Sequence, residues 1–148
     1  MENKNVKKTE EALAEIYRNA QLALESISDI LPETDDAEIR QELQAQHEEY
    51  ERFSAKAAML ASNLGLELKE PNPMKKAIMW GSIKMNTLTD KSRAHIADMM
   101  VQGTVMGVTT LRTTASELPA DGNDEILALL DEMIKTEEQF EKKWKEFL

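Results

Sequence analysis

The stretch from Met99 to Leu111 constrains the fold more than any other part of the sequence. Its thirteen residues carry no charge, although 31% of the residues in the chain are charged. A helix that is apolar on every side has to be covered on every side. We therefore expect residues 99–111 to form a helix that is shielded from water around its whole circumference. Its large apolar side chains would point in all directions: Met99, Val101, Val105, Met106, Val108 and Leu111.

A β-strand is the alternative for this stretch, because valine and threonine are common in strands. The rest of the sequence, however, offers no second strand with which it could pair. The chain is rich in Glu, Ala, Leu, Lys, Gln and Met, which are strong helix formers. Its five glycines and four prolines also allow few turns. The composition therefore predicts an all-α protein.

Apolar residues at alternating spacings of three and four predict helices along most of the chain. Thr9 is the expected N-cap of the first helix. Asp35 with Glu38, and Thr87 with Asp90, have the spacing of capping boxes. The helices are expected at about residues 9–31, 35–64, 74–86, 89–117 and 123–147.

These helices predict one domain over residues 1–148, built as a four-helix bundle. The short link 32–34 makes the first two helices an antiparallel hairpin. A second hairpin follows a crossover that contains the short extra helix 74–86. Either this extra helix or a second copy of the chain would cover the outer side of residues 99–111. We therefore expect a homodimer.

A polar layer is predicted in the middle of the bundle. Gln46, Gln102 and Glu137 occupy positions in the apolar seams of their helices. Folding the last two helices about residues 119–120 sets Gln102 opposite Glu137. Tyr50 lies one helical turn from Gln46, and Gln21 lies nearby on the first helix.

The sequence leaves two interpretations of this layer open. A carboxylate inside an apolar bundle is costly unless it is hydrogen-bonded or bound to a metal. The layer is therefore either a hydrogen-bonded device that fixes helix register, or a site for a metal or small ligand. The register interpretation is the one that the sequence favours.

The arrangement resembles the ferritin-like superfamily, with two helical hairpins joined by a crossover that residues 66–88 are long enough to form. That resemblance implies a metal site in the middle of the bundle, marked by Glu-x-x-His motifs. Glu137 matches one motif glutamate, but Phe140 stands where the histidine belongs. Gln46 replaces another carboxylate and is followed at the matching spacing by Glu49, and Gln102 stands where a third glutamate belongs. Amides are poor ligands for iron or manganese, so any such site is expected to be degenerate.

Two histidines supply further candidates. His47 lies one turn from Glu51, a spacing that can hold a metal, so the candidate divalent-metal ligands are Glu137, His47 and Glu49. His95 and Asp98 form a His-x-x-Asp pair. Packing of the His95 ring in a seam is the favoured interpretation, although imidazole can also respond to pH.

Composition excludes several classes of function. The net charge of −10 argues against binding nucleic acid, and the absence of cysteine excludes thiol chemistry. No phosphate-binding loop and no apolar run of membrane-spanning length are present. The sequence thus favours a non-catalytic, cytoplasmic, dimeric bundle without a cofactor, with a ferritin-like metal- or ligand-binding protein as the alternative.

Overall fold

The computed structural model describes residues 2–68, 90–119 and 123–148, with side chains from residue 7 onward. These ranges contain four α-helices and no strand, so the predicted all-α fold is confirmed and the strand alternative is wrong for residues 99–111. The helices are α1 (Glu2–Ile30), α2 (Ala37–Asn63), α4 (Arg93–Glu117) and α5 (Asp124–Lys145), and a 3-10 turn, η1 (Leu31–Glu33), leads from α1 to α2.

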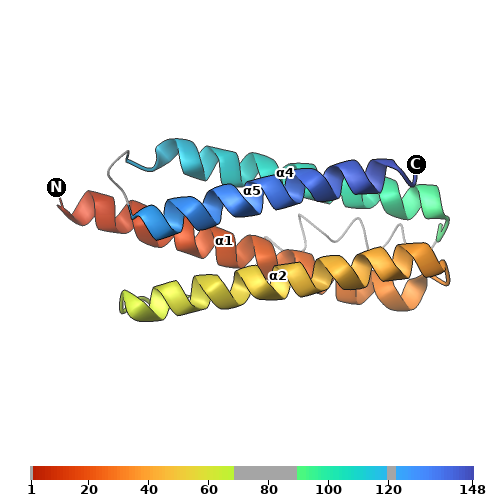
Figure 1. Cartoon of the computed structure of the whole chain (residues 1–148), viewed down its shortest axis with the longest axis horizontal. Coiled ribbons are helices and arrows are strands. Elements are labelled where there is room, and N and C mark those ends of the chain that lie inside the picture. The colour runs from red at the N-terminus through yellow and green to blue at the C-terminus, as the bar shows by residue number, and fades with distance from the viewer. Residues whose placement is uncertain (1, 69–89, 120–122) are drawn as a thin grey trace.

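The helices lie side by side as an elongated bundle (Figure 1). Most contacts join α1 to α2 and α4 to α5, and α1 also packs against both α4 and α5. Ion pairs fix the start of α4 beside the start of α2. The Arg93 guanidinium contacts Asp36 at 2.7 Å and Glu38 at 3.1 Å, and Lys91 contacts Glu33 at 3.1 Å.

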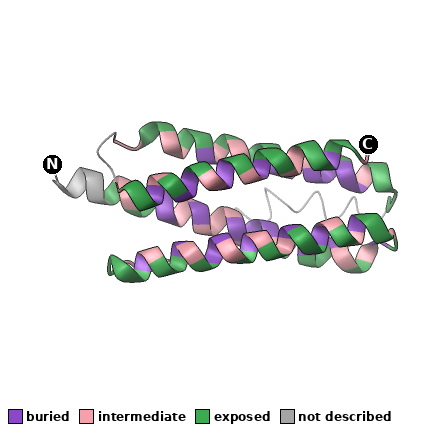
Figure 2. Cartoon of the chain, viewed as in Figure 1, coloured by how far each residue is buried: buried purple, intermediate pink, exposed green. Residues whose placement is uncertain are grey.

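The core runs along the centre of the bundle, and each helix turns its buried side inward (Figure 2). The predicted seams of α2 and α5 are confirmed over most of their length. Apolar spacing also predicts Leu60 and Leu64 in the seam of α2, but Ala61 is buried in place of Leu60 and Leu64 is 45% exposed. In the seam of α5, Phe140 and Phe147 are only partly buried. The largest fully buried side chains include Phe53 and Trp144.

Several predicted helix boundaries are wrong. Helix α1 begins at Glu2, so Thr9 lies inside the helix and does not cap it. The cap of α2 is Asp36, whose carboxylate accepts from the backbone N–H groups of Glu38 and Ile39. The cap of α4 is Ser92, which replaces the predicted box at Thr87 and Asp90. The predicted helix 74–86 and most of the crossover lie outside the described residues.

Residues 99–111 are helical but are not shielded on every side. The side chains of Val105 and Met106 are 40% and 43% exposed. The buried side of α4 instead carries small residues, among them Gly103, Thr104 and Gly107. Small residues let neighbouring helices approach closely, so part of the apolar surface of α4 is left facing outward.

Within the three described ranges, none of the helices combines the length and the apolar character needed to cross a lipid bilayer.

The capped start of α5 yields a stability prediction. The side-chain oxygen of Asn123 accepts from the backbone N–H groups of Glu125 at 3.0 Å and Ile126 at 3.3 Å. Replacing Asn123 by Ala leaves both donors without this acceptor and should lower the free energy of unfolding by about 1 kcal/mol. Urea denaturation followed by circular dichroism measures the change. Ser116→Ala, an exposed change on α4, is the control and should stay within about 0.5 kcal/mol of the parent.

Candidate functional site

The carboxyl group of Glu137 lies at the point where all four helices meet. Its side chain is 1% exposed. Oε2 accepts a hydrogen bond from the Tyr50 hydroxyl at 2.7 Å, and Oε1 accepts one from Asn19 Nδ2 at 3.2 Å. Asn19 Nδ2 also donates to the Gly107 carbonyl oxygen at 3.2 Å. We refer to Asn19, Tyr50, Gly107 and Glu137, one residue from each of α1, α2, α4 and α5, as the Glu137 cluster.

Gly107 makes the space for this carboxyl group. A Cβ atom at position 107 would lie 2.8 Å from Glu137 Oε2 and 3.0 Å from Oε1. The same Cβ atom would lie 3.1 Å from Asn19 Nδ2, so any side chain at position 107 would force the Glu137 carboxyl group to shift from its place. The ring of Tyr50, whose hydroxyl binds Glu137, packs in turn against the ring of Phe140 with centroids 5.5 Å apart, and the Glu137 side chain is 1% exposed. The carboxyl group is therefore enclosed.

Burial sets the protonation state of Glu137. Loss of hydration raises its pKa from 4.5 to about 8, although the hydrogen bonds from Tyr50 and Asn19 lower it. The pKa of Tyr50 is raised well above its usual value of 10, first by burial and then by the neighbouring carboxylate. At pH 7 the cluster therefore holds a neutral carboxylic acid beside a neutral phenol.

A second buried contact lies toward the end of α5. The indole Nε1 of Trp144 donates to Gln46 Oε1 at 2.9 Å. Gln46 Nε2 donates in turn to Glu42 Oε1, also at 2.9 Å. Gln46 is thus buried as predicted, but its amide binds Trp144 and Glu42 rather than Glu137.

Gln102 does not belong to the site, contrary to the prediction. It is exposed and donates to Asp98 Oδ2 at 2.9 Å. The residue of α4 that faces Glu137 is Gly107, five positions later, because the midpoint of this pair in the sequence is residue 122 and not 119–120. Gln21 is partly buried and donates to Ser54 Oγ at 2.7 Å, not to a residue of the cluster.

The proposed metal ligands are not brought together. His47 Nδ1 lies 2.7 Å from Glu51 Oε1, and the His47 side chain is 31% exposed. Glu49 accepts from Arg52 Nε at 2.7 Å, while Glu137 is bound inside the bundle. Among the residues that the structure describes, no three His, Asp or Glu side chains gather as a metal site.

His95 and Asp98 do not form a pair. His95 Nδ1 lies 3.9 Å from Asp90 Oδ2, and its Nε2 is buried without a hydrogen-bond partner. Asp98 is exposed and accepts from Gln102. The partial burial of the ring agrees with the expected packing role.

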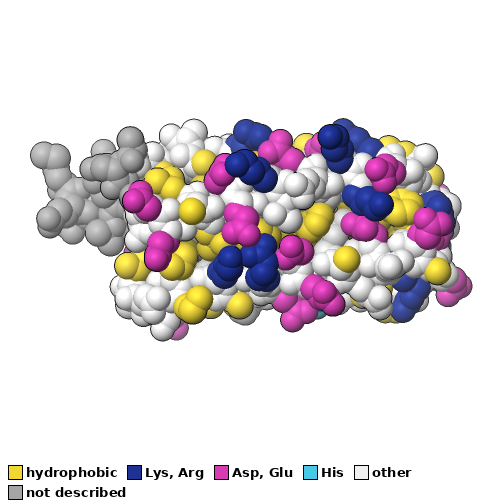
Figure 3. Space-filling view, viewed as in Figure 1, with side chains coloured by type: hydrophobic (Ala, Val, Ile, Leu, Met, Phe, Trp, Pro, Cys, Tyr) yellow, Lys and Arg dark blue, Asp and Glu magenta, His cyan; other side chains and the backbone are white. Residues whose placement is uncertain are grey.

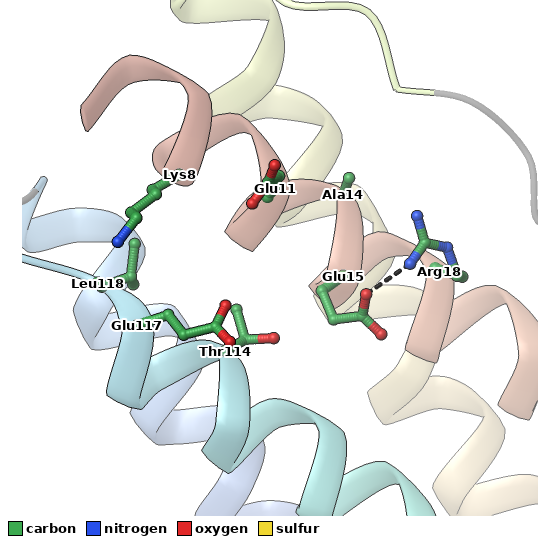
Figure 4. Close-up of a pocket in the computed structure, with 8 residues that line it drawn as sticks. All are labelled: Lys8, Glu11, Ala14, Glu15, Arg18, Thr114, Glu117 and Leu118. Atoms are coloured by element: carbon green, nitrogen blue, oxygen red, sulfur yellow. Dashed lines mark hydrogen bonds and ion pairs between the residues drawn. The ribbon is translucent and has the colours of Figure 1, made fainter. Parts of the chain in front are cut away.

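Two surface hollows lie apart from the Glu137 cluster. One hollow, of about 240 Å³, lies between α1 and the end of α4 and is lined by charged side chains such as Lys8, Glu11 and Glu117. Two further residues that line this hollow, Arg18 and Glu15, form an ion pair with each other (Figure 4). The other, of about 350 Å³, lies between α2 and α5 beside Met59 and Leu129. The face of the molecule seen in Figure 3 mixes acidic, basic and apolar side chains without a large area of one kind.

Comparisons with protein-family models, with curated proteins and with solved structures give no match for this chain.

The raised pKa of Glu137 predicts how stability depends on pH. The folded protein keeps this proton up to about pH 8, whereas the unfolded chain loses it near the ordinary value of 4.5. The folded state thus binds more protons between these values, and stability falls as pH rises through that window. The slope contributed by Glu137 reaches at most about 1.4 kcal/mol per pH unit. Urea denaturation at about pH 5.5, 7 and 8.5 measures it.

A Glu137→Gln variant isolates this contribution, because glutamine has a similar shape and does not titrate. Its free energy of unfolding should lose the extra slope seen in the parent. The matched control is Glu138→Gln, which removes an exposed carboxylate one residue along α5. Equal slopes in the parent and Glu137→Gln would show that Glu137 is ionised in the folded protein at these pH values.

Replacement of Gly107 should displace the carboxyl group. The new Cβ of Gly107→Ala would overlap both Glu137 oxygens and should cost roughly 1–3 kcal/mol of stability. In a Glu137→Ala background the contacts with the two oxygens are removed and only the 3.1 Å contact with Asn19 Nδ2 remains, so the same change at position 107 should cost less. A double-mutant cycle by urea denaturation measures this coupling. Additive effects of the two changes would contradict the close approach of Gly107 to Glu137.

Proposed function

We propose that the protein is a non-catalytic helical-bundle protein of the cytoplasm that acts as a homodimer, and that its Glu137 cluster holds the four helices in one register. The observation that carries this proposal is the hydrogen bonding of Glu137. Each carboxyl oxygen is bound by a side chain of the same chain, Tyr50 on one side and Asn19 on the other.

The surroundings of Glu137 support a structural role. A general acid or base has to reach a proton of its substrate, but Glu137 is 1% exposed. Neither of the two surface hollows described above is lined by it. The backbone of α4 lies so close that a Cβ atom at position 107 would already be 2.8 Å from Glu137 Oε2. A reacting molecule would therefore have to displace Asn19, Tyr50 or a whole helix.

The ferritin-like metal- or ligand-binding protein is the second candidate. It is favoured by the enclosure of a carboxyl and a phenol group midway along a four-helix arrangement, where such proteins hold their metals. Metal binding would require Glu137 to lose its proton and further ligands to move inward. His47 and Glu49 are engaged elsewhere by Glu51 and Arg52. This candidate thus implies a degenerate site centred on Glu137.

Elemental analysis separates the two candidates. We expect protein purified without a metal-affinity tag to contain no stoichiometric iron, manganese or zinc. Glu137→Gln has one acceptor oxygen for the two donors Tyr50 and Asn19, so we expect it to fold but to be about 1 kcal/mol less stable than the parent at pH 7. Metal that is present in the parent and in Glu138→Gln, but lost in Glu137→Gln, would instead establish the metal-binding candidate.

A further inference from the structure

The outward side of α4 has a regular pattern that the core does not use. Its exposed residues follow alternating steps of four and three, which is the spacing of a coiled-coil seam. We refer to these residues as the outer seam of α4: Asp98, Gln102, Val105, Thr109 and Arg112. The buried residues of α4, such as Met100, Gly103 and Gly107, lie on a different side of the helix. Helix α4 thus carries a second potential packing surface.

The middle of the outer seam is uncharged and its polar atoms are partly satisfied within the helix. The Thr109 hydroxyl donates to the Val105 carbonyl oxygen at 2.9 Å, and the neighbouring Thr113 hydroxyl donates to the Thr109 carbonyl oxygen at 3.0 Å. Such hydroxyls no longer need water as an acceptor. The 40% exposed Val105 lies between them and Gln102. This surface can be covered at little cost in lost hydration.

The two ends of the outer seam carry opposite charges in symmetric positions. Asp98 and Arg112 each lie seven residues from Val105, almost two full turns, so the three side chains share one line along the helix. If a second α4 lies antiparallel across the first with Val105 near the two-fold axis, each Asp98 faces an Arg112 of the other copy. Two opposite-charge pairs then flank one central apolar contact.

Arg112 is able to form such a pair without leaving its present partner. It contacts Glu138 of α5 at 2.9 Å. An arginine has five N–H donors, and in this protein the Arg93 guanidinium already contacts two carboxylates, those of Asp36 and Glu38. Arg112 of one copy can likewise bind Glu138 of its own chain and Asp98 of the other.

We propose that the outer seam of α4 is the homodimer interface, with two copies of α4 packed antiparallel about Val105. This inference rests on the dimer part of the proposed function and names its surface and register. The partner that fits is a second copy of this chain, because a two-fold axis at Val105 converts the opposite charges at the two ends into matched pairs. A parallel arrangement would place like charges together and is disfavoured.

Disulfide trapping tests the register, since the chain has no cysteine of its own. Residues on a two-fold axis meet their own copies, so Val105→Cys should be converted largely to covalent dimer by the thiol oxidant diamide. The matched control is Ser116→Cys, also exposed on α4. In this register two copies of residue 116 would lie about 30 Å apart and should remain uncrosslinked. Crosslinking at 116 but not at 105 would overturn the proposed register.

Charge reversal tests the pairing, with the oligomeric state read by sedimentation equilibrium at about 1 to 300 µM protein. Arg112→Asp sets a new carboxylate against Asp98 at both ends of the interface and should weaken dimerisation at least about tenfold, as should Asp98→Arg. The double variant Asp98→Arg/Arg112→Asp restores opposite charges and should return the dissociation constant to within about threefold of the parent. Lys135→Glu, an exposed change of charge on α5, should have little effect.

The outcomes separate this inference from the proposed function. If the parent is a dimer, but the single charge reversals leave its dissociation constant unchanged and Val105→Cys forms no covalent dimer, the homodimer stands and the outer seam is not its interface. A parent that stays monomeric at every concentration overturns both the outer seam as an interface and the homodimer. The measurements on Glu137 are independent of either result.

Discussion

The hydrogen-bonded burial of the Glu137 carboxyl group is the constraint on which the rest of the bundle depends. An unpaired acid in an apolar core costs several kcal/mol, so its position is tolerated only if each helix supplies what it needs. Helix α2 supplies the Tyr50 hydroxyl, α1 supplies the Asn19 amide, and α4 supplies the space at Gly107. The four helices are thus tied together at one depth by a group that none of them can satisfy alone.

The space that Glu137 needs also explains the character of α4. A helix that approaches its neighbours closely has to present small residues inward, and α4 buries Gly103, Thr104 and Gly107. Its remaining apolar side chains cannot all find a place in the core. Val105 and Met106 therefore face outward, and the uncharged stretch of the sequence becomes an outer surface instead of a fully enclosed helix.

Much of the fold could be predicted from apolar spacing, and part of the site could be too. Glu137, Gln46 and Tyr50 occupy seam positions, and all three are buried. Asn19 could have been found as well, because it lies between Ile16 and Ala23, two apolar residues on one side of α1. A single polar residue in an otherwise apolar row is a usable signal even when it is only partly buried.

The register between helices could not be predicted with the same accuracy. Counting outward from a hairpin doubles any error in the position of the turn. Counting from 119–120, where the midpoint of the observed pair is residue 122, therefore moved the expected partner of Glu137 from Gly107 to Gln102. Gly107 was also difficult to recognise as a site residue, because a glycine contributes only space and a carbonyl group, and its role becomes visible once the neighbouring helix is positioned.

A buried acid specifies register better than an apolar side chain of similar size would. If α5 slipped by one turn along its neighbours, Met133 or Glu141 would replace Glu137 at the level of Gly107. In the first case Tyr50 and Asn19 would lose their acceptor, and in the second Glu137 itself would lie among apolar side chains without either donor. Apolar contacts are far less sensitive to such a slip, since one methyl group can replace another. The carboxyl group therefore makes the correct alignment of the four helices more stable than its near alternatives, and because it is neutral at pH 7, it does so without the cost of a buried charge.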